Sequence, residues 1–392
     1  MTVPTLRFKE FDGAWSLKKI GDISDCIVPG RNKPKTFNGD IPWVTTPDLK
    51  NKVYVSDTLS DCYISENEAK NVGSKIVPTN SVVMSCVGDL GLFAINTAPI
   101  VINQQLHAFL LDSNKFNPIF VLNALSKNQN YIDKVATKTA LPYLNKDNCN
   151  SIPLFITTFT EQTKIAFFLS AVDEKISQLN QKHRLLCDYK QGMMQKLFSQ
   201  QIRFKADDGS EFGEWEEKKL GEVCRFINGR AYKQSEWEKE GIPVIRLQNL
   251  TGSGKEYYYS NLNLPDHQYC YNNDLLYMWS ATFGPVFWQG EKAIFHYHIW
   301  KIEVNPQLLD KKYMYFLLDE MTEKMKRSLN GSTMLHVTKQ GMEDTEKVIP
   351  SLPEQTKIAN FLSAIDQKID VVAQQIEQAK QWKKGLLQQM FV

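Results

Sequence analysis

The feature that most constrains the fold of this chain is an internal repeat. Residues 161–176 read EQTKIAFFLSAVDEKI, and residues 354–369 read EQTKIANFLSAIDQKI. Thirteen of the sixteen positions are identical at an offset of 193 residues, which chance does not produce. Weaker matches extend the repeat in both directions, because residues 6–9 resemble residues 202–205 and Gly192 and its successors resemble residues 385–388. The 392-residue chain is therefore a tandem duplication.

Each repeated stretch predicts a long helix. Thr158 with Glu161, and Ser351 with Glu354, have the spacing of a capping box that starts a helix. Apolar residues then recur with alternating spacings of four and three, as in a coiled-coil seam. A helix packed on its own domain would show a similar stripe, but two equal seams in one chain favour pairing with each other. We expect the two helices to pair with each other as a coiled coil through Ile165, Leu169, Val172, Ile176, Leu179, Leu186, Ile358, Leu362, Ile365, Ile369, Val372, Ile376 and Leu386.

Two lysines interrupt these seams at matching positions, Lys190 in the first and Lys383 in the second. One interpretation is that their aliphatic stems cover the seam while the charges reach water. The other is that the charges fix the register of the helix pair or contact a partner. The sequence leaves both interpretations open.

The segment of about 150 residues before each helix alternates short β-rich runs with Gly, Pro and Asn turns. Each segment adds one helix, near Pro118 to Leu125 in the first and near Asp310 to Lys326 in the second. The predicted fold class is α+β, with a curved sheet in each half and a pseudo-twofold repeat. The expected boundaries are 1–157 and 201–350 for the two mixed domains, and 158–200 and 351–392 for the two helices.

Composition narrows the class of protein further. The chain is 42% hydrophobic, which is enough for a core in each half, and its net charge of +2 alone indicates no nucleic-acid or membrane partner. Seven cysteines without a closely spaced pair predict reduced thiols and no structural zinc site. The N-terminus lacks an apolar leader and no long apolar run follows, so we expect a cytoplasmic protein without a membrane span.

Two fragments resemble catalytic motifs. Asn117 to Phe120 is similar to the N-P-P-Y/F loop of amino-methyltransferases, but it lacks the second proline and a methyl-donor loop upstream, and its expected counterpart at Asn305 also lacks the aromatic residue. Asp48, Glu68 and Lys70 superficially match a metal-nuclease pattern. The second half does not repeat that pattern, so we expect no catalytic residues in this chain.

Three histidines suggest a metal site at first sight, because His296 and His298 are two residues apart and His267 precedes them. His298 aligns with His107 of the first half, whose neighbours offer no second ligand. We therefore interpret these histidines as structural residues on a strand and expect no metal.

Polar and aromatic loops recur in both halves, and each contains a Gly-Arg pair at a similar place. Arg, Lys, Asn and Gln pair with base edges, whereas Ser and Thr suit phosphates. A solvated loop would have a similar composition, but the recurrence favours DNA contact. The candidate DNA-binding residues are Arg31, Lys33, Lys35, Thr46, Gln104, Thr139, Arg230, Tyr232, Lys233, Arg246, Gln248, Asn249, Thr282 and Thr333.

With these motifs the chain resembles the DNA specificity subunits of type I restriction-modification systems. The resemblance covers essentially the whole chain and is most specific in the helices that begin with Glu161 and Glu354. The Trp215 segment with Lys218-Lys219-Leu220-Gly221 is also similar to this family. One departure is Thr160, which stands where the second copy has Pro353 and affects only the start of a helix.

The resemblance implies two target recognition domains, each of which reads half of a split site in double-stranded DNA. It implies that the two repeated helices hold these domains apart as an antiparallel coiled coil. It implies two methyltransferase subunits and, for cleavage, restriction (motor-nuclease) subunits as partners. It also implies no cofactor on this chain, with S-adenosylmethionine on the methyltransferase partner and ATP and magnesium on the motor-nuclease partner. An orphan specificity subunit without a nuclease, or a self-sufficient DNA methyltransferase or nuclease, remains as an alternative.

Two hypotheses about the target follow. Residues 51–71 and 251–272 share no recognisable alignment, so the half-sites should differ and the DNA target should be asymmetric. A helix from Glu161 to Phe198 would be about 57 Å long and would act as a ruler between the two recognition domains. The near-neutral charge fits a subunit whose partners supply much of the phosphate contact.

Overall fold

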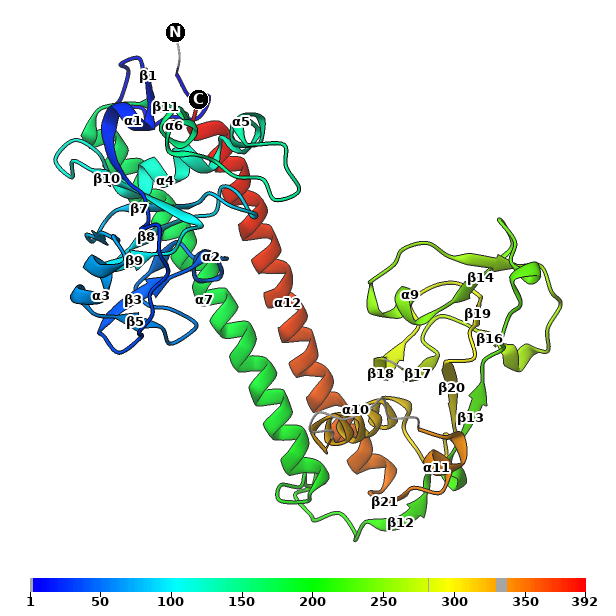
Figure 1. Cartoon of the computed structure of the whole chain (residues 1–392). Helices are drawn as coiled ribbons and strands as arrows, with labels where there is room; N and C mark the ends of the chain where they lie inside the picture. The colour runs from blue at the N-terminus through cyan, green and yellow to red at the C-terminus, as the bar shows by residue number, and fades with distance from the viewer. Residues whose placement is uncertain (1–2, 281, 329–336) are drawn as a thin grey trace. The chain divides into compact units, whose positions relative to one another are not determined.

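The computed structural model of the chain describes residues 3–280, 282–328 and 337–392 (Figure 1). It divides into two compact units, which we describe separately. Unit 1 comprises residues 1–180 and 374–392, and unit 2 comprises residues 181–373. Helix α7 (Phe159–Phe198) and helix α12 (Leu352–Met390) are each divided between the units, so each unit contains a piece of both.

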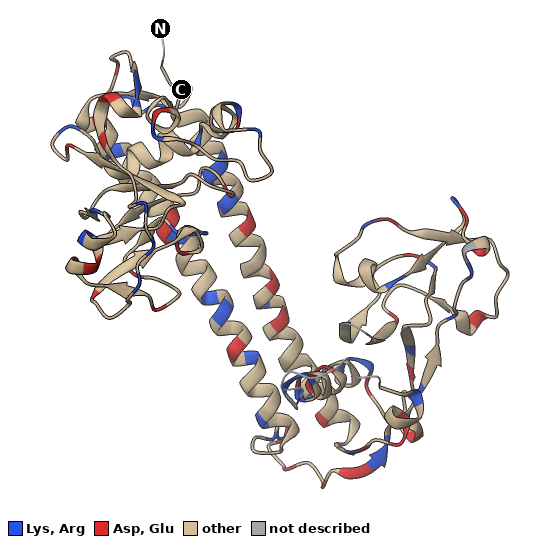
Figure 2. Cartoon of the chain, in the orientation of Figure 1, with Lys and Arg blue, Asp and Glu red and all other residues tan. Residues whose placement is uncertain are grey.

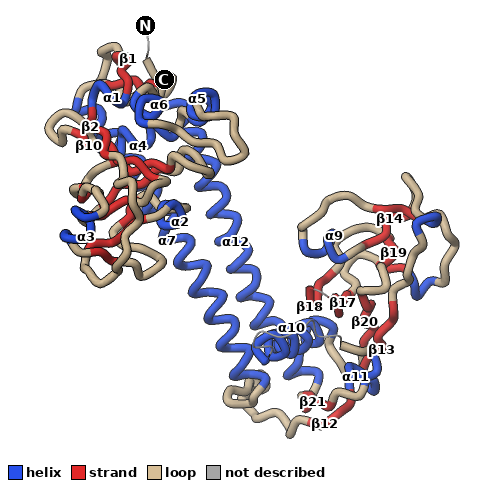
Figure 3. The backbone as a smooth tube through the Cα atoms, in the orientation of Figure 1, coloured by secondary structure: helices blue, strands red, loops and turns tan. Residues whose placement is uncertain are grey.

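Unit 1 contains three sheets, whose strands are red in Figure 3. A two-stranded pair joins β1 (Ser16–Lys19) to β11 (Pro153–Ile156). The second sheet has the order β2-β10-β7-β8-β4, with strands Ser24–Ile27, Leu106–Leu111, Val82–Ser85, Phe93–Asn96 and Tyr54–Val55. The third has the order β5-β3-β9-β6, with strands Tyr63–Ile64, Ile41–Val44, Ile100–Ile102 and Ile76–Val77. The helices are α1 (Ile20–Ile23), α2 (Thr46–Leu49), α3 (Glu66–Asn71), α4 (Pro118–Ser126), α5 (Gln129–Val135) and α6 (Lys146–Asn150).

Unit 2 repeats this plan. Strand β12 (Glu216–Lys219) pairs with β21 (Glu346–Ile349). One sheet has the order β13-β20-β17-β18, with strands Cys224–Asn228, Ile299–Val304, Leu275–Ser280 and Thr282–Phe287. The other has the order β15-β14-β19-β16, with strands Tyr258–Ser260, Ile242–Ile245, Ala293–Phe295 and Tyr269–Cys270. The helices are α8 (Leu220–Val223), α9 (Leu247–Thr251), α10 (Lys311–Ser328) and α11 (Lys339–Glu343), with short 3-10 turns η1 (Gln234–Glu236) and η2 (Asp266–Gln268).

The predicted α+β class with two long helices is confirmed, and the single helices expected near Pro118 and Asp310 are α4 and α10. The central strand β7 is buried along its whole length, and its first three residues are apolar. The small helices α5, α6 and α11 were not predicted. They are short and polar, so no periodic pattern reveals them.

Strand pairing corrects the alignment of the halves near their histidines. Phe109 lies opposite Cys26 in unit 1, and Ile302 lies opposite Phe226 in unit 2. His107 therefore corresponds to Trp300, not to His298 as the sequence alignment predicted. His298 also does not lie on a strand but in the turn between β19 and β20, and His296 at the start of that turn forms an isolated β-bridge with Arg230. The offset of 193 residues seen in the long helices thus already holds at β10.

A second correction concerns Asn117, which was matched with Asn305. The amide of Asn117 donates to the side-chain oxygen of Gln162, and the amide of Asp310 donates to that of Gln355. Asp310 is therefore the counterpart of Asn117. Both side chains accept hydrogen bonds from the first amides of the helix that follows, so both are helix caps.

Candidate nucleic-acid interface

The repeated Glu-Gln pair anchors each long helix to the mixed domain of its own unit. Glu161 is fully buried and accepts two hydrogen bonds from Arg7, at 2.7 and 2.8 Å, and another from the Thr157 hydroxyl. Glu354 is equally buried and accepts two from Arg203, at 3.1 and 2.8 Å, and one from the indole of Trp215. Such two-point pairing satisfies a buried carboxylate.

The predicted capping boxes are therefore wrong in one respect, because neither carboxylate accepts a hydrogen bond from the backbone amide of its own cap residue, Thr158 or Ser351. Only the hydroxyl half forms at the first helix, where the amide of Glu161 donates to Thr158. The neighbouring glutamine completes the anchor instead. The side chain of Gln162 accepts a hydrogen bond from the amide of Asn117 and donates to the backbone oxygens of Lys115 and Thr157. Gln355 forms the same hydrogen bonds with Asp310, Leu308 and Pro350.

Most seam residues predicted to pair the helices are buried; Ile176, Leu186 and Ile369 are half-buried. In unit 1 Ile165, Leu169 and Val172 pack in one cluster with Leu386 of α12, but also with Trp15 and Phe120 of the mixed domain. These apolar residues therefore pack against the other long helix and also against the core of their own domain, so both interpretations of the apolar seam apply in unit 1.

The two seam lysines form equivalent ion pairs. In unit 1 Lys383 lies 2.6 Å from Asp173, and in unit 2 Lys190 lies 2.8 Å from Asp366. Both pairs join α7 to α12 and fit an antiparallel arrangement, which supports the register interpretation. Lys190 also approaches Asp319 of α10 at 3.6 Å and lines a cavity of about 380 Å³ between α7, α10 and α12.

Charges elsewhere on α7 and α12 are mixed in sign. Figure 2 shows acidic and basic residues interspersed along both helices, with no stripe of one charge. This agrees with the small net charge of the chain and indicates that the long helices alone do not present a basic track for phosphates.

In unit 1 three of the candidate DNA-binding segments come together. The side-chain amide of Gln104 donates to the backbone oxygens of Gly30 and Asn32, which flank Arg31. The hydroxyl of Thr46 donates to the side chain of Gln105 at 3.2 Å. Arg31 and Lys33 are exposed on the loop that Gln104 holds. Gln104 therefore positions this loop, and Arg31 and Lys33 present its charge.

Backbone hydrogen bonds also link the loop that carries Thr139 to the turn that contains Gln104 and Gln105. Leu144 donates to the oxygen of Cys86, and Cys86 donates to the oxygen of Gln105. The Thr139 hydroxyl itself donates to the oxygen of Leu141. Lys35 lies on the other side of the first loop, where its backbone amide donates to Glu68.

In unit 2 a series of rings joins two of the predicted arginines. The guanidinium of Arg230 lies 4.7 Å from the ring of Tyr232, which stacks on Trp237 at 5.0 Å. Trp237 contacts Tyr258 at 4.6 Å, and the guanidinium of Arg246 lies 5.1 Å from that ring. Trp237 and Tyr258 were missed in the sequence, where only the run of three tyrosines at 257–259 hinted at an aromatic surface.

Other candidates in unit 2 are already engaged in the fold. Arg230 pairs with Glu236, which also accepts the amide of Lys233. The oxygen of the Asn249 side chain accepts the amide of Arg246, and its nitrogen donates to Gly254 and Glu256. Gln248 packs against Gly254. Thr282 begins β18, and Thr333 lies outside the described residues.

The turn between β19 and β20 lies beside this surface. Burial, then the neighbouring His298 and Arg246, lowers the pKa of His296 to about 4. The imidazole of His296 is therefore neutral at neutral pH. Within the described residues, His267, His296 and His298 do not bring three ligand atoms together as a metal site would.

The fragments that resemble catalytic motifs have structural roles. The side chain of Asn117 accepts the amides of Ile119 and Phe120 and caps α4. Asp48 is buried and accepts hydrogen bonds from Thr45 and Leu59. Glu68 lies at the start of α3 and Lys70 pairs with Glu66, so the nuclease pattern is not assembled.

Residues 13–186 and 213–381 each match the type I restriction modification DNA specificity domain. Together these two copies cover most of the chain, so the chain belongs to this family of DNA specificity proteins.

Among particular relatives, the chain is 24% identical to the type I restriction enzyme MjaVIII specificity subunit of Methanocaldococcus jannaschii, over 97% of this chain and 94% of that protein. It is 27% identical to the EcoBI specificity subunit of Escherichia coli over 44% of this chain and 37% of that protein.

A solved structure shows the same fold. The type I restriction-modification S subunit from M. genitalium superimposes with a TM-score of 0.59 at 16% identity, covering 100% of this chain and 99% of that one. Within the described residues no helix combines the length and the apolar character that a membrane crossing needs.

Proposed function

We propose that this chain is the DNA specificity subunit of a type I restriction-modification complex, and that each unit reads one half of an asymmetric bipartite site. One observation carries the proposal. The buried anchors of the two units share the same Arg-Glu pair and the same glutamine, whereas the turns before β10 and β20 differ completely, with Asn103-Gln104-Gln105 in one and His296-Tyr297-His298 in the other. A shared frame with different side chains suits the recognition of two different sequences.

In unit 2 the surface from Arg230 to Arg246 supplies the contact. Arg246 is half-buried beside an exposed aromatic ring, where its guanidinium is oriented and can pair with a guanine edge. In unit 1 Arg31, Lys33 and Thr139 lie on exposed loops and suit phosphate or base contact. Asn249 and Gln104 position these surfaces.

Catalysis belongs to the partners in this proposal. Two methyltransferase subunits would bring S-adenosylmethionine, and motor-nuclease subunits would bring ATP and magnesium. Asn117, Asp48 and Glu68 support this division, because hydrogen bonds within the fold already occupy their side chains. The helix pair would set the spacer between half-sites and dock the methyltransferase subunits.

The test is to express the chain with its methyltransferase partner and to sequence the methylated adenines in the host DNA. An asymmetric motif of two unlike halves separated by a spacer is the expected result. A palindromic motif would contradict the asymmetry. Incubation of the purified chain alone with DNA, methyl donor and magnesium is expected to give no turnover, and methylation or cleavage there would refute the non-catalytic role.

The spacer has its own test. Helix α7 ends at Phe198, and Gln200 has a left-handed backbone (φ 59°), so an insertion of four residues there lies beyond the helix. The insertion is expected to lengthen the spacer in the methylated motif while both half-sites stay the same. An unchanged spacer would refute the ruler.

A further inference from the structure

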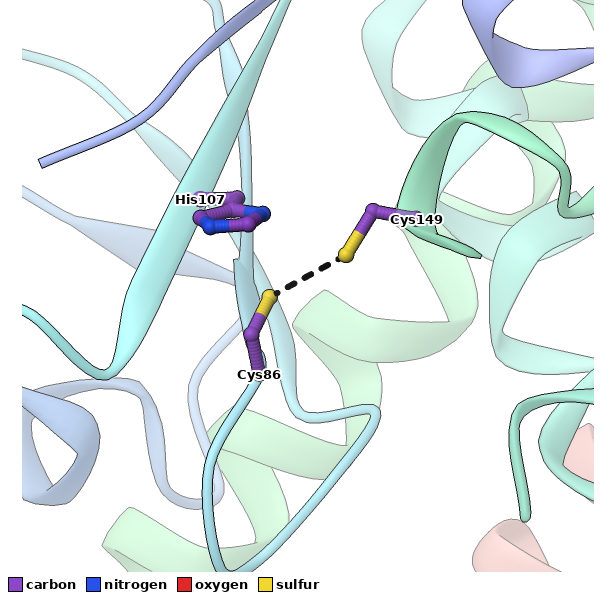
Figure 4. A group of neighbouring side chains, drawn as sticks. All are labelled: Cys86, His107 and Cys149. Atoms are coloured by element: carbon purple, nitrogen blue, oxygen red, sulfur yellow. Dashed lines mark hydrogen bonds between the residues drawn. The ribbon is translucent and has the colours of Figure 1, made fainter. Parts of the chain in front are cut away.

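Three soft ligands from distant parts of the sequence meet inside unit 1. Cys86 follows β7, His107 lies on β10 and Cys149 lies on α6 (Figure 4). The two sulfur atoms are 3.5 Å apart, and one ligand atom from each of the three residues lies within 4.8 Å of the others. Both cysteines are buried and are free thiols.

The histidine supplies a second, independent observation at this place. The side chain of His107 is 8% exposed, and its Nδ1 is buried without a hydrogen-bond partner among the residues that the structure describes. A buried polar atom left without a partner is unfavourable, because it loses its hydrogen bonds to water and gains none in the fold. Figure 4 shows the ring beside both sulfur atoms, so a ligand at their centre would engage this imidazole.

The spacing fits a metal ion better than a disulfide. Two thiolates bound tetrahedrally to one Zn²⁺ at 2.3 Å lie about 3.8 Å apart. A disulfide would require the sulfur atoms to approach to about 2.05 Å. We propose that Cys86, His107 and Cys149 bind a thiophilic metal ion, Zn²⁺ being the ion that fits best.

Cys26 is a neighbouring cysteine that could complete the site, although its sulfur is not among the three ligand atoms that lie within 4.8 Å of one another. It lies directly opposite Phe109 on the neighbouring strand, and Phe109 shares a face of β10 with His107. Its side chain packs against the same core cluster that contains Cys86 and Cys149. Three cysteines and one histidine are a ligand set of structural zinc sites.

The second unit shows that these ligands are not a requirement of the fold. At the constant offset of 193 residues, Cys86, His107 and Cys149 correspond to Trp279, Trp300 and Met342. The rings of Trp279 and Trp300 stack at 5.7 Å with an angle of 18°, and Met342 lies in the same core cluster. Unit 2 fills this place with large apolar side chains, and unit 1 fills it with smaller ligands.

Backbone hydrogen bonds connect this site to the candidate DNA-binding loops of unit 1, which carry Gln104 and Thr139. The backbone of Cys86 accepts from Leu144 and donates to Gln105, and Gly88 donates to Pro142. A bound metal would therefore fasten together the loops that carry Gln104 and Thr139. This role in reading rests on the proposed function, but binding of the metal does not.

The experiment uses the full chain, purified with a phosphine reductant and without chelators, and measures zinc per chain by elemental analysis. We expect about one zinc per chain, removal by a strong chelator and return on addition of Zn²⁺ alone. Replacement of the zinc by Co²⁺ should give thiolate-to-cobalt absorption in the near ultraviolet. Wild-type protein that holds no zinc and gives no such absorption after Co²⁺ addition would overturn the proposal.

Variants locate the site. Cys86→Ser and Cys149→Ser are expected to lower the zinc content at least about tenfold, whereas Cys62→Ser, at a half-buried cysteine outside the cluster, should retain it. Equal zinc in the Cys86→Ser, Cys149→Ser and wild-type chains would overturn the assignment. Because the wild-type measurements need no variant, a misfolded variant does not remove the test. The methylated motif reports separately on the proposed function.

Discussion

The turn before β10 in unit 1 and the turn before β20 in unit 2 have the same backbone and different chemistry. The amide of Asn103 donates to Val44 at 2.9 Å, and that of His296 donates to Ile245 at 2.9 Å. The remaining side chains are amides in the first turn and a tyrosine and a histidine in the second. Backbone hydrogen bonds therefore fix the frame, which leaves the side chains at this edge free to differ.

The helix anchors show the opposite behaviour. Arg7 with Glu161, and Arg203 with Glu354, are identical pairs in the two units. Their carboxylates are fully buried, so any change of partner would leave a charge without compensation. The buried anchors of the long helices are thus the same in the two halves of the repeat, whereas the turns before β10 and β20 differ.

The largest effect is expected at the anchor itself. Glu354→Gln removes the charge that Arg203 and Trp215 share, and should lower the free energy of unfolding by about 3–5 kcal/mol. Glu161→Gln should cost a similar amount, because Glu161 also accepts three hydrogen bonds, two from Arg7 and one from the Thr157 hydroxyl. Urea unfolding measures both, and Glu377→Gln on the exposed face of α12 is the control. Equal stability of all three variants would contradict the anchor.

These anchors also show what the sequence could reveal. The apolar seam and the Glu-Gln repeat predicted the long helices, because periodicity and identity are local properties. The partners of Glu161 could not be predicted, since Arg7 lies 154 residues away and meets it only after the chain has folded. The same holds for Cys86, His107 and Cys149, whose spacing resembles no metal motif and whose meeting depends on strand order.

At the loop edge, Arg246→Ala should affect only one half of the DNA target. Loss of the oriented guanidinium is expected to cost about 1–3 kcal/mol of discrimination at one base position. The measurement is binding of the assembled methyltransferase to duplexes that carry single changes in either half-site. Arg225→Ala, which removes an exposed pair with Glu303 on the sheet, should leave the motif unchanged. Relaxed reading in both half-sites would contradict the assignment of one half to each unit.

A smaller effect should distinguish the two seam lysines. Double-mutant cycles of Lys383 with Asp173 and of Lys190 with Asp366 are expected to give coupling free energies of about 0.3–1 kcal/mol, as for other partly exposed pairs. Lys190 should show the larger single-mutant loss, because it also contacts Asp319 and lies 5.3 Å from the ring of Phe316. Lys380→Met, at an exposed pair on α12, is the control. A coupling free energy of zero in both cycles would contradict the interpretation that Lys190 and Lys383 fix the register of the helix pair.

The difference between the two turns can also be tested through the pH dependence of stability. The pKa of His296 is lowered to about 4, while the unfolded chain has the ordinary value of 6.5. Between these values the unfolded state binds a proton that the folded state does not, so stability is full above pH 6.5 and is lost as the pH falls toward 4. After allowance for solvent at this half-buried site, the loss should be about 1 kcal/mol.

His296→Asn places in unit 2 the residue that unit 1 has at the same position, Asn103, and should flatten the pH dependence of the free energy of unfolding in this window. His267→Asn, at an exposed residue of η2, should leave it unchanged. Urea unfolding across the window measures the slopes. An equal slope in the wild-type and His296→Asn proteins would show that the two turns differ in sequence but not in their response to protons.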